Sequence, residues 1–151
     1  MTWATTVANI NTQLSAVTGI GQVINYASDQ TRHEDVVAEL VSGSILNGAM
    51  IRRESYSERQ SGGSGYRFIG KHTVKVTVVY SKKQDGSKQA DFDALLDAIA
   101  AKLRSNDSVF LVQPEDGSEA VDITPISDRM FGNMLVHHAE VRFVVEEVFE
   151  I

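Results

Sequence analysis

The closest approach to a catalytic motif in this chain is a histidine followed directly by a glutamate. The run His33-Glu34-Asp35-Val36-Val37 begins like HExxH, in which two histidines one helical turn apart bind zinc and the glutamate acts as a general base. Val37 stands where the second histidine must be, so the metal clamp is incomplete. The sequence therefore argues against a metalloprotease.

The remaining histidines do not form a metal-binding pattern either. His137 and His138 are neighbours in a predicted strand, so their side chains should point to opposite faces. His72 and His137 could approach each other across adjacent strands, but a zinc site needs three or four converging ligands. We expect structural or surface histidines, and neither a metal nor another cofactor.

Phosphate-binding and nucleophile motifs are incomplete or absent. Gly19-Ile20-Gly21 lacks the third glycine of a dinucleotide-binding loop and follows a predicted helix, so we interpret it as a turn. The chain has no complete GxxxxGK[ST] phosphate loop and no GxSxG nucleophile elbow. We interpret Asp91, Asp93 and Asp97 as helix capping and solvated charge. The sequence therefore predicts a protein that is not an enzyme.

The strongest charge feature is the stretch from residue 52 to residue 71. It has a local charge of +3 in a chain whose formal net charge is -6, because five cations stand against Glu54 and Glu58. The cations are Arg52, Arg53, Arg59, Arg67 and Lys71. At its centre, Ser61-Gly62-Gly63-Ser64-Gly65 offers no side chain to a core and has high backbone freedom. We predict a mobile basic loop over 52–71, with disorder over 57–65 in the free protein.

Two interpretations of this loop stay open: a solvated flexible tip, or a segment that orders against a partner. Arginines grip phosphates, but a chain with pI near 5.1 is not typical of proteins that bind nucleic acid. On acidic proteins, arginines more often pair with carboxylates of another protein. The five cations are therefore our candidate contacts with a protein partner, and we expect no sequence-specific nucleic acid.

Length and composition indicate one folded domain over residues 1–151. The hydrophobic content of 42% and the charged content of 23% lie near globular averages. The chain has no cysteine, which excludes disulfides, thiolate zinc sites and a cysteine nucleophile. A signal peptide pattern and an apolar run of ~20 residues are both missing, so we expect neither export nor membrane insertion.

Periodicity predicts two main helices and several strands. Apolar side chains at Trp3, Val7, Ile10 and Leu14 indicate a helix over 2–16, and a longer apolar stripe indicates a helix over 89–104. Alternation over 72–80 and 137–149 predicts two strands, each with one buried face. Less regular patterns suggest strands over 22–26, 44–56, 109–112 and 119–126 and a brief helix over 32–41.

This element order predicts an α+β domain. The sheet should be antiparallel or mixed, with the two main helices packed on one face. The strands over 44–56 and 68–80 should form a long hairpin that carries the mobile basic loop at its tip.

The layout resembles the tail terminator, or tail completion, proteins of long-tailed bacteriophages, the group typified by the lambda minor tail protein U. The resemblance covers most of the chain. It rests on the first helix ending at Leu14, the passage from Val17 to Val23, the strand from His72 to Tyr80, the helix around Phe92 to Ile99 and the last strand through Glu150.

The resemblance implies a small structural protein of the virion, made in the host cytoplasm and located at the head-proximal end of the tail. Such proteins form a hexameric ring that stops polymerisation of the tail tube and presents a surface to the head. The implied partners are further copies of the chain, the tail tube protein and a head-completion or connector protein, and DNA passes such a ring without sequence-specific contacts.

Two alternatives stay open at this point. A head-tail adaptor, or another neck joining protein, would share the ring but bind the portal side. A small α+β enzyme with an unfamiliar site would need a pocket with converging polar groups.

Overall fold

The computed structural model describes residues 3–25, 41–42, 45–61, 67–81, 89–104, 121–131 and 134–150. The run His33 to Val37, the strand predicted over 109–112 and nearly all of the brief helix predicted over 32–41 lie outside these residues.

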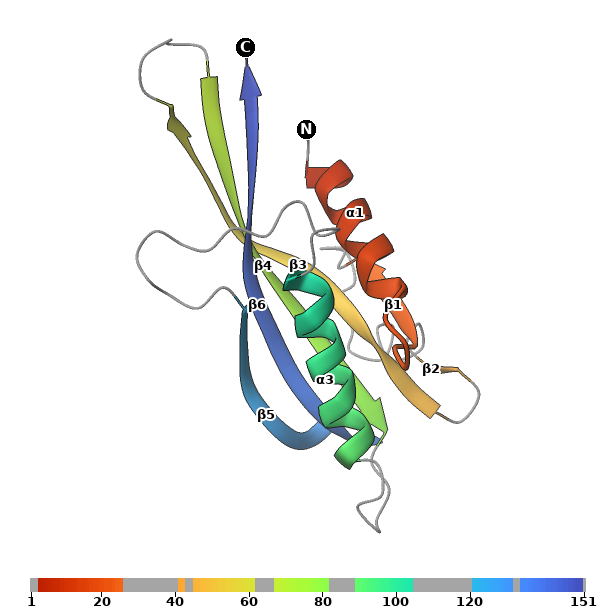
Figure 1. Ribbon diagram of the computed structural model, residues 1–151. Helices are drawn as coiled ribbons and strands as arrows, with labels where there is room; N and C mark the ends of the chain where they lie inside the picture. The colour runs from red at the N-terminus through yellow and green to blue at the C-terminus, as the bar shows by residue number, and fades with distance from the viewer. Residues whose placement is uncertain are drawn as a thin grey trace.

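Six strands form one open, mixed sheet (Figure 1) in the order β1-β3-β4-β6-β5, with β2 paired to β3 beside this path. The strands are β1 (Gln22–Asn25), β2 (Val41–Ser42), β3 (Ile45–Gln60), β4 (Arg67–Ser81), β5 (Val121–Phe131) and β6 (Met134–Glu150). Only the β1–β3 pair is parallel in the described sheet. The predicted α+β class with a mixed sheet is therefore confirmed.

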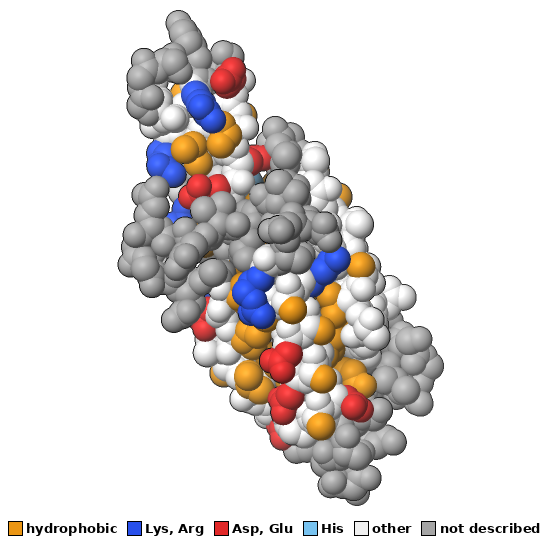
Figure 2. Space-filling view, in the orientation of Figure 1, with side chains coloured by type: hydrophobic (Ala, Val, Ile, Leu, Met, Phe, Trp, Pro, Cys, Tyr) orange, Lys and Arg blue, Asp and Glu red, His pale blue; other side chains and the backbone are white. Residues whose placement is uncertain are grey.

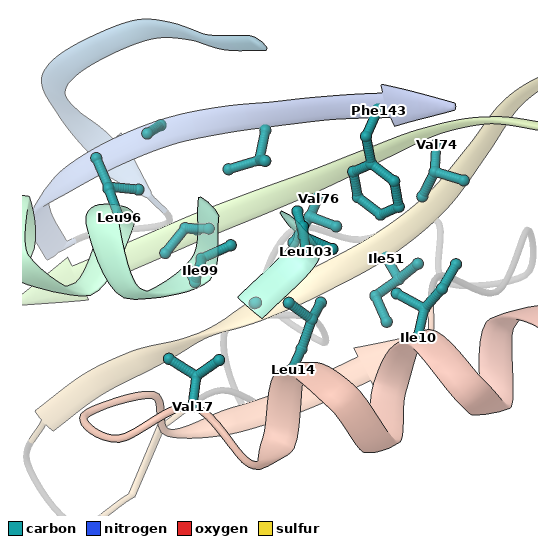
Figure 3. Close-up of a cluster of buried hydrophobic side chains, with 14 of the residues drawn as sticks. Ile10, Leu14, Val17, Ile51, Val74, Val76, Leu96, Ile99, Leu103 and Phe143 are labelled. Atoms are coloured by element: carbon teal, nitrogen blue, oxygen red, sulfur yellow. The ribbon is translucent and has the colours of Figure 1, made fainter. Parts of the chain in front are cut away.

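Two helices, α1 (Trp3–Ser15) and α3 (Gln89–Arg104), cover the same face of this sheet, as predicted. Their apolar stripes meet the inward positions of the strands in one core (Figure 3). On β4, Val74, Val76 and Val78 are fully buried, because the period of two places all three against the helices. Asp91 in the first turn of α3 and Arg104 in its last complement the helix dipole.

The turn after α1 uses its glycines for two different reasons. Gly19 has a φ of 91°, a left-handed conformation that glycine adopts without steric cost. A Cβ at Gly21 would collide with the backbone carbonyl of Asn47 on β3. Asn47 also donates a hydrogen bond of 3.1 Å to the Gly19 carbonyl. The interpretation of this passage as a turn is therefore confirmed.

The basic stretch is mostly strand. This corrects the prediction of a loop over 52–71. β3 continues to Gln60 and β4 begins at Arg67, with Cα pairs running as far as Gln60 and Phe68. The Ser61 amide then donates to the Arg67 carbonyl over 2.8 Å. Within the stretch predicted to be disordered, 57–65, residues 57–60 are paired strand, and residues 62–65 lie outside the described residues. Strand β6 is paired with β4 from Arg67 onward. The hydrogen bonds of this second ladder stabilise the extended strands against the flexibility of the nearby glycines.

Three strands continue beyond the helices as a projecting arm (Figure 1). We define the arm as Ser57–Gln60 of β3, Arg67–Lys71 of β4 and Glu146–Glu150 of β6, which are paired in register. The rest of the sheet, with the helices that cover it, is called the body. The predicted long hairpin is thus confirmed, and β6 gives it a third strand.

Candidate protein-interaction site

The five candidate cations divide between the two faces of the sheet. Arg53 pairs in register with Val74, whose side chain is in the core, so Arg53 lies on the helix-covered face. The other four lie on the opposite face by alternation and are Arg52, Arg59, Arg67 and Lys71. Most of the predicted contact residues therefore share one face, and Arg53 has a separate role.

Arg53 belongs to a cluster at the base of the arm. Its guanidinium carbon lies 5.2 Å from the centre of the Trp3 ring and 5.3 Å from that of the Tyr56 ring, within cation–π range. Tyr56 in turn stacks on His72, with ring centres 4.6 Å apart. The basal cluster, defined as Trp3, Arg53, Tyr56, His72 and Glu147, joins the first turn of α1 to three strands.

A buried hydrogen bond between His72 and Glu147 lies at the centre of the basal cluster. His72 Nε2 donates to Glu147 Oε1 over 3.1 Å, and these side chains are 1% and 4% exposed. The other polar atoms of the pair, His72 Nδ1 and Glu147 Oε2, are buried without a hydrogen-bond partner in the described structure. Because buried polar groups are costly when unpaired, the two side chains depend on each other for stability.

Tyr56 closes the cluster from the outer edge of the sheet. Its hydroxyl donates to Glu58 Oε1 over 2.7 Å, and this hydrogen bond, with burial and the Glu58 charge, raises the pKa of Tyr56 to about 12. Gly70 makes room for the ring, because a Cβ there would lie 2.8 Å from the Tyr56 hydroxyl. Tyr56 thus stays protonated at neutral pH and keeps 39% of its surface exposed.

Carboxylates and cations alternate across the helix-free face. Arg142 lies 2.7 Å from Glu140 and 3.6 Å from Glu54, and Lys75 lies 3.8 Å from Glu54 and 3.9 Å from Glu140. Further along the strands, Arg59 is 3.7 Å from Glu146. These partly exposed pairs link β3, β4 and β6, and each adds little to the free energy of unfolding.

Strand β6 therefore neutralises part of the basic stretch. Lys71 is paired in register with Glu146, and Arg67 with Glu150. Sequence reasoning missed these carboxylates because they lie about 80 residues away in the chain. The local charge of +3 along the sequence is accordingly smaller in space, and the arm presents a mixed surface with exposed cations.

The sequence also contains a partial phosphate-loop spacing, of which the structure describes only the second half. Gly65, Gly70 and Lys71 match GxxxxGK, but His72 stands where serine or threonine is required. Lys71 and His72 lie inside β4, with no helix following them to supply amide donors. The match is therefore coincidental, and Lys71 counts as a surface cation of the arm.

A second polar site lies in the body beside β5. Asp128 is 2.7 Å from His137 Nδ1, and the His137 ring stacks on Phe92 of α3 with centres 5.4 Å apart. A pocket of about 180 Å³ is formed here by Gln89, Phe92, Ile126, Ser127, Asp128 and His137. His137 is 1% exposed, and its Nε2 has no hydrogen-bond partner in the described structure.

The two neighbouring histidines do lie on opposite faces, as predicted. His138 is buried on the helix-free face, where burial first, and then the positive charge of Arg129, lowers its pKa. His72 is far from His137, because His137 pairs with Tyr80, eight positions along β4. Within the described ranges, no three potential metal ligands converge.

Apolar side chains are exposed on the hairpin of β5 and β6. Ile126 is 54% exposed, Met130 58% and Leu135 48%, and Met130 and Leu135 are cross-strand neighbours. Figure 2 shows acidic side chains gathered on the lower part of the molecule. Asp93 and Asp97 of the neighbouring helix α3 are exposed. This edge therefore combines apolar and acidic groups.

Comparison with known proteins identifies no relative of this chain. No protein-family model matches the chain, and no curated protein matches its sequence. None of the described helices is both long enough and apolar enough to cross a membrane.

Proposed function

We propose that this chain is a structural protein of a phage virion that caps the head-proximal end of the tail tube as a ring. The observation that supports this proposal is the arm, which carries three paired strands beyond the helix-covered body. A preformed projection with exposed cations suits contact with the next subunit of an assembly. It needs little ordering, and so loses little entropy on binding.

The ring is proposed to stop polymerisation of the tube and to present its other face to the head. Its partners are further copies of the chain, in a hexamer, the tail tube protein and a head-completion or connector protein. The proposed contacts with acidic neighbours are the cations on the helix-free face, in the arm and next to it: Arg52, Arg59, Arg67 and Lys71. No cofactor and no catalytic step belong to this function, and DNA passes through the ring without sequence-specific contacts.

Removal of the protein from the phage tests the function directly. Virions that lack a terminator should show abnormally long tails by electron microscopy, because nothing stops the tube. Tails of normal length that are detached from heads would instead indicate a head-tail adaptor and would overturn the proposal.

A pair of arm substitutions tests the contact role. The double variant Arg67→Ala/Lys71→Ala should leave the fold intact, since exposed charge changes usually alter stability by within about 0.5 kcal/mol. It should weaken attachment to the tail and lengthen the tails. The matched control, Lys102→Ala/Arg104→Ala at the end of α3, removes two cations of similar exposure and should give tails of normal length. Normal tails with both variants would refute the arm's contact role.

A further inference from the structure

Arg53 lies on the helix-covered face, apart from the other four candidate cations, and we propose that it binds a carboxylate of a neighbouring protein in the assembled particle. The site is the corner where the arm leaves the body, formed by Arg53 with the rings of Trp3 and Tyr56. We call these three residues the aromatic corner. This contact rests on the virion role proposed above and adds a second interaction surface to it.

The guanidinium of Arg53 is held by aromatic rings alone. Its central carbon lies 5.2 Å from the centre of the Trp3 ring and 5.3 Å from that of the Tyr56 ring. Among the described residues, Arg53 makes no hydrogen bond and no ion pair, whereas Arg59 lies 3.7 Å from Glu146. Stacking on rings uses the flat faces of a guanidinium. The N–H donors at its edge therefore stay available for an anion.

The two rings are themselves held in place before any partner arrives. Both contact the buried His72 ring, with centres 5.4 Å from that of Trp3 and 4.6 Å from that of Tyr56. His72 is fixed in turn by its hydrogen bond to Glu147. A side chain that is ordered in the free protein loses less entropy on binding. Tryptophan, tyrosine and arginine are also the residue types that contribute most to binding at protein interfaces.

A second aromatic pair continues this surface onto the arm. Phe68 and Phe149 are cross-strand neighbours with ring centres 5.8 Å apart, and both are partly exposed. Alternation places Phe68 on the same face as His72, four residues or about 13 Å along β4. Gly70 lies between them and carries no side chain. The partner segment that suits this surface has a carboxylate for the aromatic corner and an apolar side chain for the phenylalanine pair.

The surrounding charges favour a protein carboxylate over the phosphates of a nucleic acid. Glu58 accepts the hydrogen bond of the Tyr56 hydroxyl at 2.7 Å, so the aromatic corner already has a carboxylate at its rim. The chain as a whole has a formal net charge of -6. Closely spaced phosphates are repelled by both. A single carboxylate meets less repulsion, and its two oxygens match the fork of a guanidinium.

An introduced lysine tests the chemistry of the contact, because a carbodiimide condenses an amine with a carboxylate only where the two groups touch. In purified tails that carry Arg53→Lys, we expect an amide bond from the new amine to an aspartate or glutamate of another chain. Denaturing gels should show a product larger than the single chain, and mass spectrometry should locate the bond. Arg104→Lys, at the exposed end of α3, is the matched control and should give no such product.

Binding to tails that lack the chain measures the strength of the contact. With Arg53→Ala, the protein concentration that half-saturates these tails should rise at least about tenfold. Arg53→Lys should raise it less, because lysine keeps the charge and loses only the fork. Arg104→Ala should leave it unchanged. Equal binding by Arg53→Ala and wild type, with both proteins folded, would overturn the contact.

The same tails separate this contact from the terminator function. Tails that contain the Arg53→Lys chain but give no product with another chain, or coupling to Glu58 of the same chain alone, would overturn the contact and leave the terminator role standing. Weaker binding by Arg53→Ala without any coupling by Arg53→Lys would indicate a phosphate ligand and would overturn the contact as well. Tails without this chain would overturn both.

Discussion

The body and the arm are built from the same three strands, yet different interactions hold them. In the body, alternate residues of β4 are valines buried under two helices. In the arm the same face carries Gly70 and its partner Glu147, and the described helices end short of it. Apolar burial therefore stabilises the body, whereas ladder hydrogen bonds and the basal cluster order the arm. A change that unfolds one region need not unfold the other.

The largest effect should come from the body's core. Phe92→Ala removes a fully buried ring that packs on Tyr80 and His137, and should lower the free energy of unfolding by about 3–5 kcal/mol. Chemical denaturation would measure this loss. Val148→Ala in the arm, at a residue 52% exposed, should change stability by less than about 0.5 kcal/mol. Equal losses would contradict the contrast between the two regions.

The base of the arm should respond at an intermediate level. Gly70→Ala places a methyl group 3.1 Å from Tyr56 Cε2, so the ring must leave its stack on His72. We expect a loss of about 1–2 kcal/mol, since overpacking is costly but the tyrosine is partly exposed. In a Tyr56→Ala background the same substitution should cost little, which a double-mutant cycle would reveal. A cost that persists there would point to backbone strain instead.

The body should also lose stability in acid through His138. Its pKa is lowered in the folded state, so between the unfolded value of about 6.5 and the lowered value the unfolded chain binds more protons. The free energy of unfolding therefore falls as pH falls through that window. His138→Leu should reduce this fall relative to wild type, measured by denaturation at pH 7 and in mild acid. An unchanged pH dependence would refute this contribution of His138.

The sequence revealed the body well because its signals are local. Period-two alternation placed Val74, Val76 and Val78 on one face, and the 3.6-residue stripe of α3 gave its bounds as Gln89 and Arg104. Nearby residues decide both patterns. The assignment of the fold class followed from the order of these elements.

The arm was harder to predict because its order depends on distant partners. Glycines between Ser61 and Gly65 suggested a long mobile loop, whereas β3 stays paired with β4 as far as Gln60, and β4 is paired in turn with β6. The bulge after Arg53 also brings Tyr56 onto the helix-covered face, where it meets His72. No local sequence pattern predicts a bulge, so the basal cluster was missed. No local pattern predicts a carboxylate on a distant neighbouring strand, so the partial neutralisation of the cations was missed as well.

The smallest effect should come from the arm's own ion pair. Arg59 and Glu146 are 3.7 Å apart, with side chains 52% and 21% exposed, so water and salt screen their attraction. A double-mutant cycle with Arg59→Ala and Glu146→Ala should give a coupling below about 0.5 kcal/mol that shrinks further in high salt. Such a weak pair leaves the guanidinium able to exchange its internal carboxylate for one on a neighbouring subunit at little cost. A coupling well above 1 kcal/mol would mean that the pair is part of the arm's structure, and its cation would then be a poor candidate for contact with a partner.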